Sequence, residues 1–186
     1  NICKSENIDT KKISPKYILS VIDNWKNKGW YPEEVVIKKK NILEKGFLSI
    51  YKIYQSKLIS LNTCDFSDLI LHCVKIFEKN SDIAELYSKN FKFILVDEYQ
   101  DTNLIQSKWL NYLAKYNKNI CCVGDDDQSI YSWRGAEIKN FLEFDKIYLN
   151  TKIIRLEKNY RSTQNILSVA SKLISNNQNR VGKNLY

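Results

Sequence analysis

Residues 91–102 read Phe-Lys-Phe-Ile-Leu-Val-Asp-Glu-Tyr-Gln-Asp-Thr, and this segment predicts the class of fold. Its apolar run, Phe93 to Val96, is short and bounded by polar residues, which is typical of a strand buried on both faces of a parallel sheet. Asp97 and Glu98 follow where the strand would meet its loop, the usual place for ligands in an open parallel sheet. Two adjacent carboxylates there fit a nucleotide hydrolase, in which one acid holds Mg²⁺ and its neighbour orients water on the γ-phosphate.

The segments that follow repeat this pattern. Asn119 to Val123 and Ile153 to Leu156 are predicted strands, and an amphipathic helix is expected between the first two strands. A strand, a helix and a strand in this order predict parallel pairing. The sequence Gly-Asp-Asp-Asp-Gln at 124–128 follows the second strand, so we expect a second polar cluster at the sheet edge that holds Asp97 and Glu98.

An aromatic pair follows this second cluster. Tyr131 and Trp133 occupy alternate positions beside Arg134, a composition suited to stacking on nucleic-acid bases with a cation nearby. The alternative is that the two rings fill a gap beneath a loop, and the three residues by themselves do not separate these interpretations.

The first half of the chain is predicted to be helical. Ser14 and Pro15 form a helix start signal, and Gly29 ends the run that follows. Apolar residues then recur at spacings of four and three from Phe47 to Leu61, and Asp65 precedes a further helical run. We assign the aromatic residues of these stripes to the core.

Composition limits the class of protein. The chain has 186 residues, of which 44% are hydrophobic, and a formal net charge of +8. This length suits one ordinary domain or two small ones, and the basic excess is consistent with a phosphate-bearing partner or with a lysine-rich soluble surface. The five cysteines lack Cys-x-x-Cys spacing, which argues against a disulfide framework or a zinc ribbon. No apolar run is long enough for a membrane span and no signal-peptide pattern opens the chain, so we expect a soluble, cytoplasmic protein.

The sequence has no phosphate-binding loop. Gly-x-x-x-x-Gly-Lys-Ser/Thr occurs nowhere in it, and no two of its five glycines are five positions apart. The chain also starts at Asn1 and contains no methionine. We therefore expect a trimmed piece of a larger ATPase, which by itself does not hydrolyse ATP.

Three segments together resemble the UvrD/Rep/PcrA family of superfamily 1 helicases. Residues 97–103 look like the family's Walker B segment, residues 124–136 resemble its third motif, and residues 156–163 are similar to its fourth. Tyr54-Gln55 and residues 65–69 resemble the end of the family's helical accessory subdomain. Three long motifs in the right order are hard to obtain by chance.

The resemblance implies an α/β fold, a partial RecA-like P-loop NTPase parallel sheet with a helical accessory subdomain. Residues 1–88 would form this accessory subdomain, residues 89–157 the C-terminal part of the first RecA-like motor domain, and residues 158–186 the start of the second motor domain.

The resemblance also implies ATP and Mg²⁺ as cofactors and a role for individual side chains. These roles are Mg²⁺ binding for Asp97, water activation for Glu98, γ-phosphate sensing for Gln128, base stacking for Tyr131 and Trp133, coupling of nucleotide to DNA for Arg134, adenine stacking for Tyr160, and an arginine finger for Arg161. A fixed guanidinium at Arg161 makes chemical sense because it neutralises charge that develops on the transferred phosphoryl group, while a simple salt bridge is the alternative.

The leading interpretation is part of an ATP-dependent 3′-to-5′ DNA helicase that moves on single-stranded DNA, engages duplex junctions, and acts in DNA repair or replication restart. The rest of the helicase chain would be needed to complete the ATP site. One alternative is the motor subunit of a recombination helicase-nuclease, which a nuclease domain in the full-length protein would reveal. Another is a non-catalytic DNA-binding or interaction module, and a third is a metal nuclease built on Asp97, Asp101 and residues 125–127.

Overall fold

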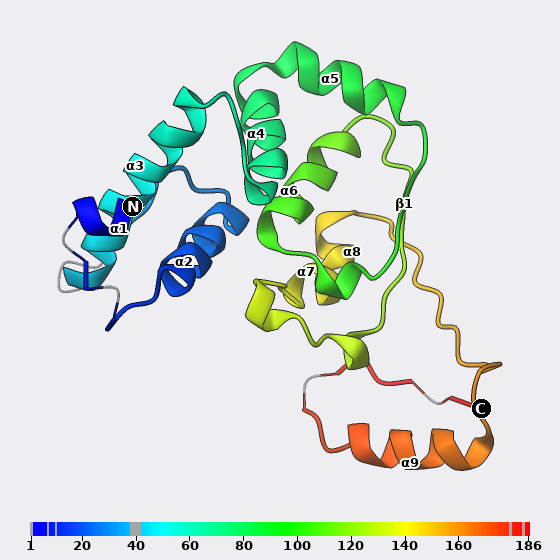
Figure 1. Cartoon of the computed structure of the whole chain (residues 1–186). Coiled ribbons are helices and arrows are strands. Elements are labelled where there is room, and N and C mark those ends of the chain that lie inside the picture. The colour runs from blue at the N-terminus through cyan, green and yellow to red at the C-terminus, as the bar shows by residue number, and fades with distance from the viewer. Residues whose placement is uncertain (1, 7, 10, 38–41, 179, 184) are drawn as a thin grey trace. The chain divides into compact units, whose positions relative to one another are not determined.

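The structure is a computed structural model that describes residues 2–6, 8–9, 11–37, 42–178, 180–183 and 185–186 (Figure 1). The first half of the chain is helical and comprises α1 (Ile2–Ser5), α2 (Pro15–Asn27), α3 (Ile42–Ser60), α4 (Phe66–Lys79) and α5 (Ser81–Asn90). The remainder comprises β1 (Ile94–Val96), η1 (Tyr99–Asp101), α6 (Leu104–Leu113), β2 (Ile120–Cys122), η2 (Asp126–Gln128), η3 (Ser132–Arg134), α7 (Lys139–Leu142), α8 (Phe144–Ile147) and α9 (Gln164–Ile174). This order confirms the expected helix-rich α/β class.

The ends of α2 follow from its sequence. The Ser14 hydroxyl accepts a hydrogen bond from the Tyr17 N–H at 3.2 Å, and Pro15 takes the first helical position. Gly29 lies just beyond the end of the helix with φ at +85°, a conformation that glycine adopts without steric cost. The helix therefore begins and ends as predicted.

Reciprocal hydrogen bonds begin α4 and α6. The side chain of Asp65 accepts from the Asp68 N–H, and the side chain of Asp68 accepts from the Asp65 N–H. Asn103 and Gln106 form the same capping box at the start of α6, as their spacing predicts. Each box satisfies two N–H groups for which a helix has no partner of its own.

The strands β1 and β2 pair in parallel. The Ile94 N–H donates to the Asn119 carbonyl at 2.9 Å, and further along both strands the Val123 N–H donates to the Val96 carbonyl at 2.8 Å. Because the partners advance in the same direction on both strands, the loops that follow the strands start at the same edge. The expected parallel pairing is confirmed for these two strands. The expected burial on both faces is wrong, since Leu95 of β1 and Cys121 of β2 are exposed.

The third expected strand is wrong for this structure. Residues 153–156 have no regular secondary structure, and Ile153, Ile154 and Leu156 are exposed. Their apolar pattern suits a buried strand, but a strand also needs a neighbour that pairs with its N–H and C=O groups. Within the part of the chain that the structure describes, the sheet contains only β1 and β2.

The chain falls into two compact units. The first is Asn1–Ile94 with Asn103–Ile120, and the second is Leu95–Thr102 with Cys121–Tyr186. The boundary crosses each strand after its first residue, so the loops that follow β1 and β2 belong to the second unit. The division into accessory and motor domains at residues 88 and 157 stays a prediction.

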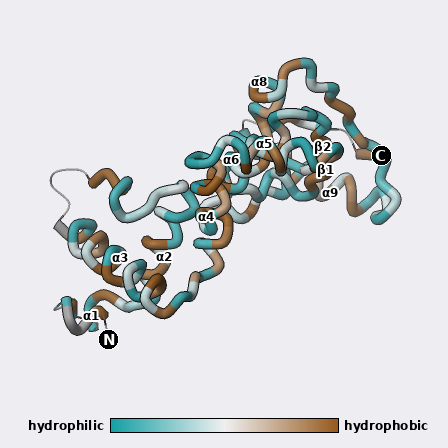
Figure 2. The backbone as a smooth tube through the Cα atoms, turned by 90° about the horizontal axis from the view of Figure 1, so that it is seen from above, coloured by the Kyte–Doolittle hydropathy of each residue, from teal (hydrophilic) through white to brown (hydrophobic). Residues whose placement is uncertain are grey.

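Clusters of buried apolar side chains stabilise the first unit. The largest joins α2 to α3 and consists of Ile18, Ile22, Trp25, Phe47, Ile50 and Tyr51. Smaller clusters are formed by Leu71, Val74 and Ile105, and by Phe77, Ala84 and Leu113. Figure 2 shows hydrophobic and hydrophilic residues alternating along α2 and α3, as expected for helices that bury one face. None of the helices in the described ranges is both long and apolar enough to cross a membrane.

Candidate functional site

Asp97 and Glu98 lie in the loop after β1, and both side chains are exposed. Glu98 has φ at +51°, a left-handed conformation that costs a non-glycine residue about 1–2 kcal/mol. The Glu98 N–H donates to Asp97 Oδ1 at 2.9 Å. Strained backbone of this kind persists only where the surrounding structure enforces it, and such residues cluster at functional sites.

Gln100 connects the loop after β1 to the loop after β2. It is 1% exposed, its side-chain Nε2 donates to Glu98 Oε2 at 2.7 Å, and its Oε1 accepts from the Asp125 N–H at 3.0 Å. A buried amide with both ends hydrogen-bonded is held in one orientation. Gln100 therefore fixes the Glu98 carboxylate relative to the second loop.

Gly124 permits this close approach of the two loops. A Cβ atom at position 124 would lie 2.6 Å from Gln100 Oε1 and 2.8 Å from the Phe141 ring of α7. Both distances are well inside van der Waals contact, so any side chain here would displace Gln100 or Phe141. The glycine is thus required by packing.

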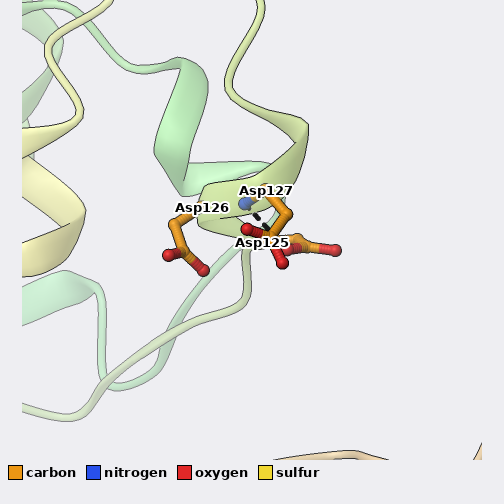
Figure 3. Close-up of side chains that lie close together, drawn as sticks. All are labelled: Asp125, Asp126 and Asp127. Carbon is orange, nitrogen blue, oxygen red and sulfur yellow. Dashed lines mark hydrogen bonds between the residues drawn. The ribbon is translucent and has the colours of Figure 1, made fainter. Parts of the chain in front are cut away.

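Three consecutive carboxylates follow Gly124 (Figure 3). One oxygen from each of Asp125, Asp126 and Asp127 can be chosen so that all lie within 4.8 Å of one another, a spacing that a cation could bridge. The Asp127 N–H donates to Asp125 Oδ1 at 3.1 Å, the bond dashed in Figure 3, and the Gln128 side chain donates to Asp125 Oδ2 at 2.6 Å. Asp125 thus holds Gln128 in place.

Basic groups from the end of the chain contact this acidic cluster. The Arg180 guanidinium donates to both carboxylate oxygens of Asp127, at 2.8 and 2.5 Å, and the Lys183 ammonium pairs with Asp125. Burial raises the pKa of the Asp125 carboxyl, but hydrogen bonds from Lys183 and Gln128 outweigh burial and hold this pKa below its ordinary value. Cations of the chain itself therefore already neutralise two of the three aspartates.

The aromatic pair lies on the surface around η3. Trp133 is 73% exposed and Tyr131 is 36% exposed, with ring centroids 6.3 Å apart and planes at 50°. The Arg134 guanidinium lies 5.1 Å from the Tyr131 centroid and 4.8 Å from the Trp133 centroid. In this structure Trp133 does not fill a core gap, and its ring is accessible to a flat ligand.

Tyr160 and Arg161 lie on the segment before α9. Tyr160 is 86% exposed, and the Lys158 ammonium lies 5.3 Å from its ring centroid. The N–H groups of Arg161 and Ser162 donate to Asn159 Oδ1 at 2.9 and 2.8 Å. Among the described residues no ion pair or hydrogen bond joins the side chains of Tyr160 or Arg161 to Asp97 or Glu98, whereas Gln100 bonds both to Glu98 and to the loop after β2.

Three residues of this site were not predicted from the sequence. Gln100 lies within residues 91–102, but nothing in that stretch of sequence shows that its side chain reaches the loop after β2. Arg180 and Lys183 stand in an asparagine-rich tail whose composition carries no signal. Long-range partners at separations of 53 to 58 residues, such as Arg180 with Asp127 and Lys183 with Asp125, become visible only in the folded chain.

Comparison with known proteins gives a consistent family. The sequence profile of the UvrD/REP helicase N-terminal domain matches residues 1–148. The chain is 48% identical over its whole length to a probable DNA helicase II homolog of Rickettsia conorii, and covers 29% of that protein. It is 44% identical over its whole length to the ATP-dependent DNA helicase PcrA of Bacillus subtilis, and covers 25% of that protein. The chain thus spans between a quarter and three-tenths of the length of these relatives.

Proposed function

The chain belongs to the UvrD/REP helicase N-terminal domain family, and we propose that it is a segment of an ATP-dependent DNA helicase. In this proposal the full-length protein moves 3′ to 5′ on single-stranded DNA, engages duplex junctions, and serves DNA repair or replication restart in the cytoplasm. The observation that carries the proposal is the joining of two polar loops at one sheet edge, through the hydrogen bonds of Gln100 to Glu98 and Asp125.

Asp97 has the chemistry of a Mg²⁺ ligand. Magnesium prefers carboxylate oxygens and keeps several of its waters, so one exposed aspartate is a suitable protein ligand. Asp97 is exposed and, within the described ranges, forms no ion pair that would compete for its charge. The residues therefore fit the metal, which when bound would neutralise charge on the phosphates of ATP.

Glu98 is proposed to orient the water that attacks the γ-phosphate. Its carboxylate is exposed, yet Gln100 holds one oxygen at 2.7 Å, so the group is positioned before a ligand arrives. Gln128 follows on the second loop and is proposed to contact the γ-phosphate, while Arg161 is proposed to neutralise charge that develops during phosphoryl transfer. Tyr160, with an exposed ring, is proposed to stack on the adenine.

Tyr131, Trp133 and Arg134 are proposed to contact single-stranded DNA. Every base presents a flat π-face, so an exposed aromatic pair binds bases with little sequence preference. The Arg134 guanidinium lies close to both rings and can stack with them or pair with a phosphate. Because η3 follows η2 in the chain after three residues, a shift of Gln128 on nucleotide binding has a short covalent route to the aromatic pair.

Replacing Glu98 by Gln in the full-length helicase tests the proposed chemistry. Glutamine keeps the length of the side chain and removes its charge, so we expect ATP binding to survive and hydrolysis to fall by about 10²–10⁴-fold. Single-turnover ATP hydrolysis with and without DNA gives the rate, and nucleotide titration gives the binding. Unchanged turnover in the Glu98→Gln variant would reassign the water-orienting role.

A DNA-binding module is a second candidate for the isolated 186-residue chain. The exposed aromatic pair is intact in this chain, whereas its sequence contains no phosphate-binding loop. We expect the isolated chain to bind single-stranded DNA weakly and to show no measurable ATP hydrolysis. DNA-stimulated ATP turnover by the purified chain would contradict this expectation.

A further inference from the structure

The end of the chain bonds to all three aspartates of the loop after β2. Arg180 forms a bidentate pair with Asp127, Lys183 pairs with Asp125, and the Val181 N–H donates to Asp126 Oδ2 at 2.7 Å. We call these three interactions the tail contact. A bidentate arginine–carboxylate pair is among the stronger and more directional ion pairs, and both partners here are largely shielded from water.

The same tail bonds to the segment that carries Tyr160 and Arg161. The Tyr186 N–H donates to the Glu157 carbonyl at 3.1 Å, and the Asn159 N–H donates to the Tyr186 carbonyl at 2.8 Å. Asn159 in turn holds the Arg161 N–H through its side chain at 2.9 Å. The tail therefore bonds at one end to the loop that contains Gln128 and at the other to the segment that contains Arg161.

We propose that Arg180 and Lys183 are positioning residues, which set the placement of Gln128 relative to the Asn159–Arg161 segment through the tail contact. This inference rests on the proposed function, in which Gln128 and Arg161 act on the same phosphate. Neither Arg180 nor Lys183 touches the nucleotide in this proposal.

Asp125 contacts both Gln128 and the tail. Its Oδ2 atom accepts from the Gln128 side chain at 2.6 Å and also pairs with the Lys183 ammonium. A shift of Gln128 toward a phosphate weakens one of these two bonds and leaves Asp125 to Lys183 alone. Binding of a phosphate to Gln128 therefore changes the interaction between Asp125 and Lys183. Conversely, loss of the tail contact allows Asp125 and Gln128 to adopt other orientations.

Charge reversal and charge exchange test the tail contact directly. In the full-length helicase, Arg180→Asp places two carboxylates together, so hydrogen exchange of the tail peptide that contains Val181 should become about tenfold faster. Combining Arg180→Asp with Asp127→Arg restores opposite charges and should restore slow exchange. Unchanged exchange in the single variant, or no recovery in the double variant, would overturn the tail contact whatever the helicase activity.

ATP hydrolysis tests the positioning role. We expect Arg180→Asp to lower kcat by about ten- to a hundredfold with a nearly unchanged KM for ATP, because misplacement of a transition-state group affects the chemical step more than binding. The double variant should recover most of kcat. Lys183→Gln is the milder variant should Arg180→Asp fail to fold, and it should reduce kcat in the same direction.

Lys146→Asp is the matched control, since Lys146 forms an exposed ion pair with Glu143 in the same unit at 3.1 Å. It should change neither exchange of the tail peptide nor kcat. The positioning role would be overturned by one combination of results. In it, slow exchange of the tail peptide is lost in Arg180→Asp and regained in the double variant, while kcat is the same in all proteins. An unsubstituted full-length protein without ATPase activity would instead refute the proposed function, while the exchange data would still decide the tail contact.

Discussion

Charged residues of the helical unit differ in burial and pairing from those of the loops after the strands. In the helical unit the Lys26 ammonium is completely buried and lies 2.6 Å from Asp65 and 2.8 Å from Asp68. After β1, by contrast, Asp97 and Glu98 are exposed, and the Glu98 carboxylate accepts a hydrogen bond from the uncharged side-chain amide of Gln100. The buried charges pair with one another, whereas the exposed carboxylates remain able to bind a ligand.

Tryptophans repeat the contrast. Trp25 is 8% exposed and stacks on Tyr51 with ring centroids 5.9 Å apart, inside the α2–α3 core. Trp133 is 73% exposed beside Arg134. Tryptophan therefore stabilises the core of one unit and lies exposed to solvent in the other. Burial of the ring distinguishes the two roles.

Removing the buried ammonium should have the largest effect on folding. Lys26→Ala leaves Asp65 and Asp68 as two carboxylates with no cation between them, so we expect a loss of about 3–5 kcal/mol in the free energy of unfolding. Denaturant unfolding measures this loss. Lys52→Ala, at an exposed position of α3, is the control and should stay within about 0.5 kcal/mol of the original protein. Equal effects of the two substitutions would show that the ion pairs of Lys26 with Asp65 and Asp68 do not stabilise the helical unit.

Two glycines should respond to alanine with opposite signs. Gly124→Ala forces a methyl group against Gln100 and Phe141, and we expect it to destabilise the fold by about 1–3 kcal/mol. Gly46→Ala places a methyl group in open space within α3 and should stabilise the fold by about 0.5–1 kcal/mol. Thermal melting of both variants checks the signs, and a stabilised Gly124→Ala would contradict the tight packing beneath the candidate site.

Acid should weaken the helical unit through Asp65. Burial raises the pKa of this carboxyl, but the Lys26 ammonium and the Asp68 N–H outweigh burial, so the folded pKa lies below its ordinary value. A carboxyl with a depressed folded pKa gives stability above its unfolded pKa of about 3.9, and this stability is lost as the pH falls through the folded pKa.

We therefore expect the free energy of unfolding to decrease as the pH is lowered below about 4. The decrease should be smaller than the loss of free energy caused by Lys26→Ala at neutral pH. Denaturant unfolding between pH 7 and pH 3 measures the slope. Asp65→Asn removes this titrating group and should flatten the curve in that range. An unchanged slope in Asp65→Asn would assign the acid sensitivity to other carboxylates.

The sequence predicted local structure well because local structure depends on neighbouring residues. Ser14 and Pro15 begin α2, and Asn103 with Gln106 begins α6, since each signal acts within one helical turn. Residues 153–156 failed as a strand because pairing depends on a second segment, which no local pattern reports. Burial of Lys26 was likewise hidden, since its partners lie 39 and 42 residues away.

Parts of the candidate site were predictable for the same reason. Asp97, Glu98 and the 124–128 segment were placed at one sheet edge from the parallel pairing alone, and the structure brings these loops together through Gln100. The roles of the individual side chains in ATP and DNA binding stay predictions. The tail contact of Arg180 and Lys183 required the folded chain, because nothing in the sequence pairs a tail arginine with an aspartate 53 residues before it.

Substituting the two tryptophans in the full-length helicase tests the division between buried and exposed residues most directly. Trp133→Ala should weaken single-stranded DNA binding by about 1–3 kcal/mol, with normal thermal melting and an unchanged slope of affinity against salt, because phosphate contacts are untouched. Trp25→Ala should destabilise the fold by about 3–5 kcal/mol and leave the DNA affinity of the folded fraction unchanged. A large melting shift in Trp133→Ala, with normal affinity of the protein that stays folded, would contradict the proposed stacking surface.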